Sequence, residues 1–456
     1  MNLVKVNENI FREYDIRGIY GEDLSEDVAY TIGRSYGTYV KKYGEKKVVI
    51  GRDNRTSSPI LSNALISGIL ESGTDVVNIG MVTTPMFYFA KKFLHLPAGI
   101  MITASHNPSE YNGFKTSFES FGNAYGQMIK DFCTFTNNHN FDNGNGTETN
   151  IDISEDYIRK IEGSIDFDGK KPRVVVDLGM GVASTIVSRV MDRLGFTYVT
   201  INEKKDLSLP SEYGDPSVKE KMFDLRDKVL ELGYDLGIGL DGDADRIGVV
   251  DENGYILNTE EYMVIMYRYL NKDLKTRKGL IDVKCGMKII DELKKLDIEP
   301  FMNRTGNSYQ NIAMQEGDFD FGGEFSGHLW FRDRWIGTDD GLYNGLRMAE
   351  VMTNTKKKLS ELREGMVECF STPEIKVKVT EENKFDIVNK VLEHCKKNNY
   401  KLVTKDGVRI EFQDSWVLIR ASNTGPNLTV RAEAKNEDRM NELKDMALNL
   451  IEEFSK

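Results

Sequence analysis

The residues that could do chemistry lie in four short polar loops. The first loop is Thr-Ala-Ser-His-Asn-Pro at 103–108. Ser105 could act as a nucleophile there. We do not expect His106 to be a simple general base for it, because adjacent residues in a strand or loop rarely face the same way. The alternative is an ordinary polar loop.

The second loop carries three carboxylates at a spacing of two, Asp241, Asp243 and Asp245. Converging carboxylates are the hard oxygen ligands that Mg²⁺ or Ca²⁺ prefers. If the three anions are partly buried, their mutual repulsion requires a cation or a basic partner. We therefore predict a metal site, and a solvated acidic turn is the alternative.

Two other interpretations of this loop fit less well. A calcium-binding helix–loop–helix would use Glu252 at its twelfth position, but Arg246 stands where that loop needs glycine, and the flanking runs look like strands. A haloacid-dehalogenase type of phosphatase would use Asp241 as the nucleophile and Asp243 as the acid. It leaves Asp245, Arg246 and Ser105 without a role.

The third and fourth loops carry groups suited to a phosphorylated sugar. Glu324, Ser326 and His328 lie among glycines, and their mixed donors and acceptors suit sugar hydroxyls. The stretch 420–426 offers a guanidinium, two hydroxyls, an amide and backbone N–H groups for a phosphate. The alternatives are a polar turn and a capped hairpin turn.

Strands must position these loops, and the chain repeats one pattern three times. Hydrophobic strands at 47–51, 173–176 and 279–283 each begin a strand–helix–strand unit that ends in a polar loop. In the first unit, Ser58 suits the helix N-cap and Pro59 the first helical position. Alternating strands and helices predict mostly parallel sheets whose loops collect at one edge.

The last 85 or so residues follow another pattern, with close-set strands at 408–412, 416–420 and 428–432. The fold class we predict is three related α/β domains with mixed, mostly parallel sheets, followed by a smaller C-terminal α+β domain with an antiparallel sheet, around a central cleft. The predicted domains span 1–152, 153–257, 258–371 and 372–456.

Composition restricts the class of protein. The net charge of −12 argues against nucleic acid or an anionic membrane as a partner. No apolar run approaches the length of a membrane span, and the first residues lack the apolar core of a signal peptide. Four cysteines are scattered without paired spacing. We therefore expect a cytoplasmic protein.

Together these motifs resemble those of the α-D-phosphohexomutases, the phosphoglucomutase/phosphomannomutase family, over essentially the full length. The four loops match the family's phosphoserine, metal, sugar-recognition and phosphate-binding loops in the same order. Further matches are 11–18, 51–59, 112–115 and 282–285. The chain is most similar to the bacterial phosphomannomutase/phosphoglucomutase branch, which implies an isomerase.

The resemblance implies a mechanism. Ser105 would carry a phosphoryl group, and Mg²⁺ would be held by a phosphoserine oxygen with Asp241, Asp243 and Asp245. The phosphoryl group passes to a hexose 1-phosphate, the hexose 1,6-bisphosphate intermediate turns over, and hexose 6-phosphate leaves. The other implied catalytic residues are Arg17, Lys115 and His328. The implied substrate-binding residues are Tyr14, His106, Arg246, Lys284, Asn307, Glu324, Ser326, His328, Arg420, Ser422, Asn423 and Thr424.

One residue departs from the branch, because Asn307 follows Thr305-Gly306 where histidine is common. Asparagine cannot shuttle a proton near neutral pH, so this departure bears on the acid–base chemistry and on the preferred sugar. The expected partners are hexose phosphates, with the chain as a monomer or homodimer. Three alternatives stay open: a phosphoglucosamine mutase, a metal-dependent sugar phosphate phosphohydrolase, and a binding protein without turnover.

Overall fold

The computed structural model describes residues 1–422 and 425–455. The chain is divided between two units. Unit 1 comprises Met1–Asn258, Asn311–Gly317 and Ser326–Leu362, and unit 2 comprises Thr259–Gln310, Asp318–Phe325 and Arg363–Lys456. Among the described residues, unit 1 contains two complete sheets. Unit 2 contains one complete sheet and most of another.

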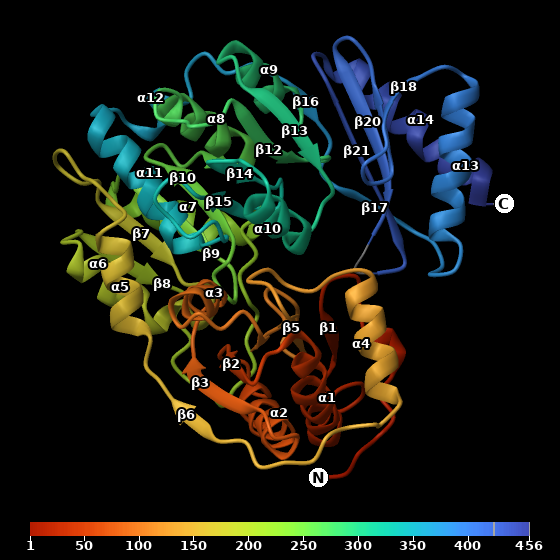
Figure 1. Cartoon of the computed structure of the whole chain (residues 1–456). Helices are drawn as coiled ribbons and strands as arrows, with labels where there is room; N and C mark the ends of the chain where they lie inside the picture. Colours follow the sequence, from red (N-terminus) through yellow and green to blue (C-terminus); the bar gives the residue numbers. More distant parts are fainter. Residues whose placement is uncertain (423–424, 456) are drawn as a thin grey trace. The chain divides into compact units, whose positions relative to one another are not determined.

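Unit 1 begins with a mixed six-stranded sheet (Figure 1). The first two strands in spatial order pair antiparallel, and the last four run parallel. The strands, in spatial order, are β1 (Ile16–Ile19), β5 (Tyr111–Ser117), β4 (Gly99–Ile102), β2 (Lys47–Arg52), β3 (Asp75–Met81) and β6 (Glu148–Asn150). The accompanying helices are α1 (Glu26–Tyr39), α2 (Ser58–Glu71), α3 (Thr84–Phe93) and α4 (Gln127–Asn137).

Helices α1 and α2 pack closely because glycines face each other where they cross. A Cβ atom on Gly33 would lie 2.1 Å from the carbonyl oxygen of Leu65, and one on Gly68 would lie 2.3 Å from that of Tyr30. The start of α2 corrects one prediction. Ser57 is the N-cap and Ser58 the first helical residue, and among the described residues no side-chain hydrogen bond caps this helix. Both hydroxyls are used elsewhere: that of Ser58 donates to Asp53 at 2.5 Å, and that of Ser57 accepts from Asn112 at 2.8 Å.

The second sheet of unit 1 holds the acidic loop. Its strands, in spatial order, are β11 (Ile256–Leu257), β10 (Ile247–Asp251), β9 (Leu236–Leu240), β7 (Val174–Asp177) and β8 (Tyr198–Ile201). Strands β9, β7 and β8 are parallel, and β9, β10 and β11 form antiparallel pairs. The helices are α5 (Ser154–Glu162), α6 (Val187–Arg193), α7 (Phe223–Leu232) and α11 (Gly341–Thr355), with α12 (Leu359–Leu362) and β15 (Leu329–Phe331) also in unit 1.

Unit 2 contains a parallel sheet and an antiparallel sheet. The parallel strands are β13 (Glu299–Asn303), β12 (Lys278–Asp282) and β14 (Phe321–Gly323), with α8 (Thr259–Leu270) and α9 (Met287–Lys295). Helix α10 (Asn307–Glu316) follows β13. The antiparallel strands are β16 (Phe370–Ser371), β17 (Ile375–Lys378), β21 (Asn427–Ala434), β20 (Ser415–Ala421), β19 (Val408–Glu411) and β18 (Lys401–Val403).

Helices α13 (Lys384–Lys397) and α14 (Glu437–Ser455) lie on one face of the antiparallel sheet (Figure 1). Both contribute apolar side chains to the core that this sheet buries, among them Val391 of α13 and Ala447 of α14. The predicted fold class is confirmed: α/β domains with mixed sheets precede a smaller antiparallel α+β domain. The domain boundaries stay predictions.

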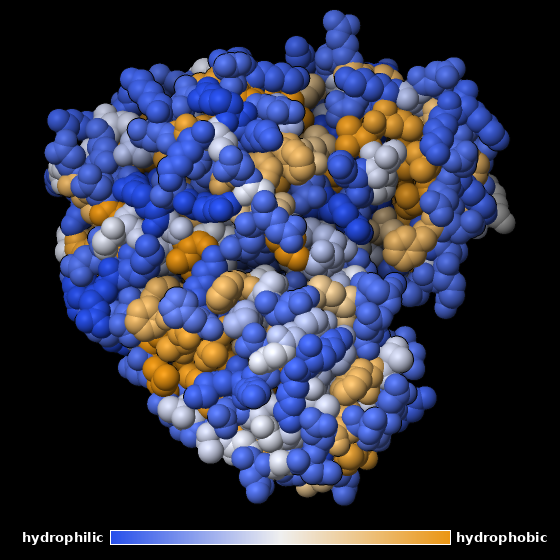
Figure 2. Space-filling view, in the orientation of Figure 1, coloured by the Kyte–Doolittle hydropathy of each residue, from blue (hydrophilic) through white to orange (hydrophobic). Residues whose placement is uncertain are grey.

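Hydrophilic residues cover most of the face shown in Figure 2, and the hydrophobic residues on it form small groups. Among the described residues, none of the helices combines the length and the apolar character needed to cross a membrane.

Candidate active site

Ser105 lies just after β4, and its side chain is buried. Its hydroxyl donates to Asp241 Oδ2 at 2.6 Å and lies 3.1 Å from His106 Nδ1. The expectation that the two neighbouring side chains point apart was therefore wrong. Ser105 has a left-handed backbone with φ of 51°, which ends the strand-like alternation and turns both side chains to the same side.

His106 is nevertheless a poor base. Burial, and then the nearby positive charge of Arg246, lower its pKa to about 3. A group with so low a pKa holds no proton near neutral pH and accepts one weakly. Because the one hydroxyl hydrogen of Ser105 is donated to Asp241, a neutral His106 with its hydrogen on Nδ1 donates to the serine oxygen. His106 therefore fits an orienting role better than proton removal.

The three aspartates of the acidic loop follow β9 and are completely buried. Their carboxylate oxygens lie within 4.8 Å of one another, because the left-handed Ala244, with φ of 64°, turns the loop tightly. Burial, and then the charges of the other two carboxylates, raise the pKa of Asp241 well above its usual range.

Lys115 is the basic partner that the three buried carboxylates were expected to require. Its ammonium lies 2.7 Å from Asp243 Oδ2 and 2.6 Å from Asp245 Oδ2. Burial disfavours this ammonium, but the two carboxylates outweigh it and raise the pKa of Lys115 well above its usual range. Thr84 Oγ1 also donates to Asp243 at 2.6 Å, a contact that sequence reasoning missed.

Some carboxylate oxygens of the acidic loop are available to bind a cation. Among the described residues, Asp243 Oδ1 and Asp245 Oδ1 are buried without a hydrogen-bond partner. Two unsatisfied carboxylate oxygens and a serine oxygen within 2.6 Å of the third aspartate form an all-oxygen donor set. Such a set fits Mg²⁺.

His328 is held between an acid and a guanidinium. Its Nδ1 lies 2.7 Å from Asp339 Oδ2, and its Nε2 accepts a hydrogen bond from Arg246 Nε at 3.0 Å. The ring is therefore neutral here, with its proton on Nδ1. Burial lowers the pKa of His328, but Asp245 and Asp339 outweigh burial and raise it. Sequence reasoning missed Asp339.

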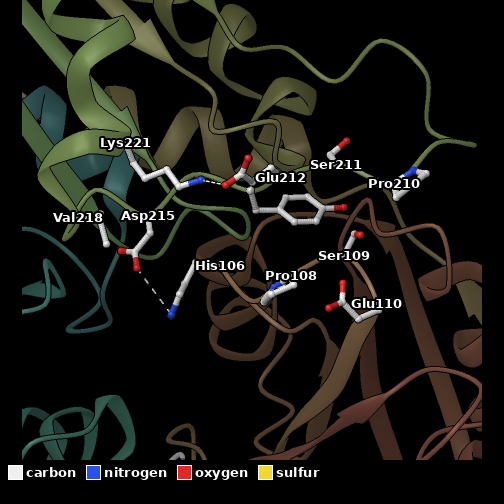
Figure 3. Close-up of a pocket in the computed structure, with 11 residues that line it drawn as sticks. His106, Pro108, Ser109, Glu110, Pro210, Ser211, Glu212, Asp215, Val218 and Lys221 are labelled. Carbon is white, nitrogen blue, oxygen red and sulfur yellow. Dashed lines mark hydrogen bonds and ion pairs between the residues drawn. The ribbon is translucent and has the colours of Figure 1, made fainter. Parts of the chain in front are cut away.

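Asp215 is a second acid that the sequence did not reveal. It lies 3.6 Å from Arg246 and 3.8 Å from His106 Nε2, so it connects the acidic loop with the serine loop. Figure 3 shows Asp215 and His106 facing each other beside a pocket of about 580 Å³. Lys221 and Glu212 form an ion pair in its wall.

Of the remaining predicted residues of unit 1, Arg17 lies in β1, and Tyr14 and Ser326 lie in loops. Arg17 donates to Asn107 Oδ1 at 2.8 Å, and it pairs with Asp15, so it contacts the serine loop rather than Ser105 itself. Tyr14 is half-buried in the segment that precedes β1. Ser326 is half-buried in the turn that precedes His328.

Unit 2 contains most of the residues that were predicted to bind the sugar and its phosphate. Glu324 is buried and accepts the backbone N–H of Gly306 at 2.7 Å, next to Asn307, the first residue of α10. Lys284 pairs with Glu374 at 2.8 Å. Burial opposes the charge of Lys284, but Glu374 and then Asp282 raise its pKa above the usual range.

The loop predicted to bind phosphate, 420–426, begins at the end of β20. Arg420 donates to Asp406 Oδ2 at 3.0 Å, and the same oxygen accepts the N–H of Thr305. Asp406 thus joins this loop to the segment that carries Asn307, and no sequence pattern indicated it. Ser422 is half-buried after β20. The predicted Asn423 and Thr424 lie outside the described residues.

Comparisons with known proteins cover nearly all of the chain. Four phosphoglucomutase/phosphomannomutase family models match it: α/β/α domain I at 8–142, domain II at 155–254, domain III at 258–370 and the C-terminal domain at 374–450. A phosphomannomutase/phosphoglucomutase of Pseudomonas aeruginosa is 35% identical over 449 residues, which are 97% of this chain and 95% of that protein.

Two further relatives agree. A phosphoglucomutase of Neisseria gonorrhoeae is 33% identical over 455 residues, 99% of this chain and 98% of that protein. The crystal structure of a phosphoglucomutase/phosphomannomutase family protein from Burkholderia thailandensis superimposes with a TM-score of 0.90 at 32% identity, and covers 99% of both chains.

Proposed function

Because the chain belongs to the phosphoglucomutase/phosphomannomutase family, we propose that it interconverts hexose 1-phosphates and hexose 6-phosphates of glucose, mannose or both. The reaction passes through a phosphoserine on Ser105 and a hexose 1,6-bisphosphate. The observation that carries the proposal is the 2.6 Å contact between the Ser105 hydroxyl and Asp241, within a buried triad of aspartates.

The triad is assigned to Mg²⁺, with Asp241, Asp243, Asp245 and a Ser105 oxygen as its ligands. When bound, Mg²⁺ neutralises the charge that develops on the transferred phosphoryl group. Phosphoryl transfer depends on positioning and charge stabilisation more than on covalent chemistry by the protein. Lys115 adds a fixed positive charge at the triad, and Arg17 adds a guanidinium at the serine loop.

His328 is the proton-transfer group we assign. Asp339 holds its Nδ1–H, which leaves Nε2 as the atom that can gain a proton. Arg246 covers that nitrogen, so a substrate phosphate that drew Arg246 away would free it. The raised pKa of His328 favours protonation close to neutral pH.

Recognition of the substrate is assigned to the remaining polar groups. Glu324 and Ser326 suit the sugar hydroxyls, and Arg420, Ser422, Asn423 and Thr424 suit the phosphate that is not reacting. We assign supporting contacts to Tyr14, His106, Lys284 and Asn307. Asn307 is the position where the preferred sugar would be decided.

The first test is a coupled assay with Mg²⁺ and catalytic glucose 1,6-bisphosphate. It compares glucose 1-phosphate, mannose 1-phosphate and glucosamine 1-phosphate and measures inorganic phosphate in parallel. We expect 6-phosphates of glucose or mannose without phosphate release. Release of phosphate without isomerisation would identify a phosphohydrolase, and a preference for glucosamine 1-phosphate would identify a phosphoglucosamine mutase.

The matched variants are Ser105→Ala and Ser109→Ala, which remove hydroxyls from the same loop. We expect the first to lose at least about 10⁴-fold in turnover, because the group that carries the phosphoryl is gone. The second should stay within about threefold of the parent protein. Near-normal turnover by a folded Ser105→Ala variant would refute the mechanism.

A further inference from the structure

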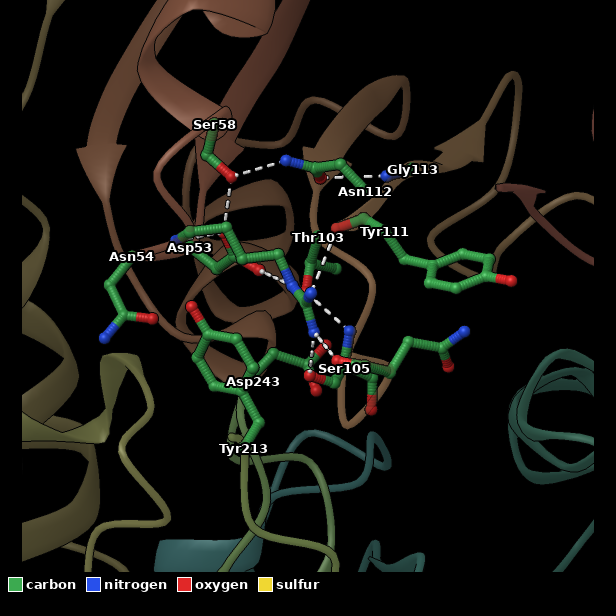
Figure 4. A network of polar contacts seen from close by, with 12 residues as sticks. Asp53, Asn54, Ser58, Thr103, Ser105, Tyr111, Asn112, Gly113, Tyr213 and Asp243 are labelled. Atoms are coloured by element: carbon green, nitrogen blue, oxygen red, sulfur yellow. Dashed lines mark hydrogen bonds and ion pairs between the residues drawn. The ribbon is translucent and has the colours of Figure 1, made fainter. Parts of the chain in front are cut away.

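Figure 4 shows a polar network around Ser105 that the mechanism above does not use. By its hydrogen bonds, Arg55 is the centre of this network. It belongs to the loop that follows β2, and its side chain is completely buried. One terminal nitrogen donates to the carbonyl oxygens of Ser105 at 2.8 Å and Asn107 at 2.7 Å. The other donates to those of Pro108 at 2.8 Å and Tyr111 at 3.0 Å.

Four carbonyls of one seven-residue segment therefore converge on a single planar group. Only a guanidinium offers several donors in a rigid plane, so these contacts fix the path of the backbone rather than a single point of it. The segment contains the left-handed Ser105, a conformation that is uncommon outside glycine and needs support from its surroundings.

The guanidinium is itself held in place on two sides. Asp53 pairs with Arg55 Nε at 3.2 Å and accepts its backbone N–H at 2.9 Å. The ring of Tyr213 stacks on the guanidinium, 4.3 Å from its central carbon. The Tyr213 hydroxyl accepts a hydrogen bond from Lys204 at 3.2 Å.

The same cluster touches the acidic loop. A Cβ atom on Gly242 would lie 2.4 Å from the carbonyl oxygen of Ser105 and 3.1 Å from the ring of Tyr213. The Ser105 carbonyl that Arg55 binds is thus packed directly against the backbone between Asp241 and Asp243. Movement of this carbonyl would change the separation of the Ser105 hydroxyl from the triad.

We propose that Arg55 is a positioning residue that holds the serine loop in its left-handed conformation and so presents the Ser105 hydroxyl to the acidic loop. Tyr213 keeps the guanidinium in the required plane. The inference rests on the proposed phosphoryl transfer at Ser105, but the geometry that it explains is independent of which sugar reacts.

The test compares Arg55→Lys with Arg52→Lys. Lysine keeps the charge at position 55 but has neither the planar fork nor the face that stacks on Tyr213. Among the residues that the structure describes, Arg52 donates only to the carbonyl of Asp53, so its variant controls for a lost guanidinium in the same motif. We expect Arg55→Lys to lose at least about 100-fold in kcat while KM for glucose 1-phosphate stays within about threefold.

Two further measurements separate this inference from the proposed function. Phosphorylation of Ser105 by glucose 1,6-bisphosphate, followed by intact mass, should slow at least about tenfold in Arg55→Lys alone. Amide hydrogen exchange of the peptide covering 103–111 should accelerate in Arg55→Lys and not in Arg52→Lys. If the parent protein shows no isomerisation, the proposed function is wrong. The hydrogen-exchange measurement then still tests whether Arg55 holds the serine loop in place.

A folded Arg55→Lys variant with parental kcat and parental exchange would overturn the inference. If Arg55→Lys does not fold, Tyr213→Leu and Tyr213→Phe decide it, since both keep Arg55. Loss of the ring in Tyr213→Leu should lower kcat about tenfold or more, and Tyr213→Phe, which keeps the stacking face, should retain most of it. Equal kcat in these two variants would overturn the inference as well.

Discussion

Lys115 holds together two of the three buried carboxylates, those of Asp243 and Asp245, which would otherwise repel one another. Among the described residues, the second oxygen of each of these two carboxylates has no hydrogen-bond partner. The ammonium and a divalent cation can therefore bind different oxygens of the same two carboxylates. This division lets both positive charges offset the repulsion at the same time.

Replacement of Lys115 by methionine tests that division. The variant should lose about 3–5 kcal/mol of stability, because two buried carboxylates lose their partner. Added Mg²⁺ should recover part of this loss, so the thermal midpoint should rise with Mg²⁺ more in the variant than in the parent. Differential scanning fluorimetry with and without EDTA measures both effects.

Lys91→Met is the matched control for this prediction. Lys91 is completely buried, and it donates hydrogen bonds to Ser117 Oγ at 2.6 Å and to the carbonyl of Phe121 at 3.0 Å, neither of which is a carboxylate. Its removal should leave the response to Mg²⁺ equal to that of the parent. An equal response in Lys115→Met would show that the triad does not depend on the ammonium.

The residues that sequence reasoning found and those that it missed differ in where their partners lie. Ser105 and the three aspartates stand in short loops after hydrophobic strands, so local pattern was sufficient. Asp339 and Asp215 act on His328 and Arg246, which the chain brings close only by folding. An isolated acidic residue at an unremarkable position carries no local signal of such a contact.

At the scale of elements, β2 begins where the sequence predicted, at 47, and ends one residue after the predicted 51. It is a short apolar run with a charged residue at each end, which leaves little choice of boundary. The start of α2 was predicted one residue late. Neither serine hydroxyl caps the helix there, because contacts made only in the folded chain use both: Ser58 binds Asp53, and Ser57 binds Asn112.

Helix α11 begins at a buried cap that should respond to pH. Asp340 accepts the N–H of Tyr343 at 3.0 Å and the hydroxyl of Tyr157 at 2.7 Å. Burial raises its pKa from 3.8 to about 7. The folded protein therefore keeps this proton up to about pH 7, whereas the unfolded chain releases it near pH 4. Stability from this group is present at low pH and falls as the pH rises between these values.

Asp340→Asn removes that dependence, because asparagine can cap the helix but does not ionise. Over the full range the difference amounts to about 4 kcal/mol, from about 1.4 kcal/mol per pKa unit. We expect the thermal midpoint of the parent to fall relative to that of Asp340→Asn between pH 5 and pH 7.5. Parallel midpoints at the two pH values would show that Asp340 titrates as an ordinary carboxyl.

At the scale of the whole molecule, the chemical groups are divided between the two units. Unit 1 contains Ser105, the aspartate triad and His328, which suit metal binding and phosphoryl transfer. Unit 2 contains Glu324, Lys284 and Arg420, which suit a sugar phosphate. The strand patterns in the sequence predicted the sheets that carry these groups, but they could not predict Asp406. It binds Arg420, which is near it in sequence, and also Thr305, which lies about 100 residues earlier.

This division predicts separate responses to the metal and to the sugar phosphate. Mg²⁺ alone should slow amide hydrogen exchange in peptides that cover 103–108 and 239–247, since the ligands proposed for it all lie in unit 1. Glucose 1-phosphate without Mg²⁺ should slow exchange in peptides around Arg420 and Lys284, whose positive charges we propose bind the phosphate. Exchange measured by mass spectrometry with each ligand alone tests both expectations.

Arg420→Lys should weaken only the second response, because lysine cannot form the paired hydrogen bonds of a guanidinium. Protection of the unit 2 peptides by Mg²⁺ alone would contradict this assignment of the two ligands.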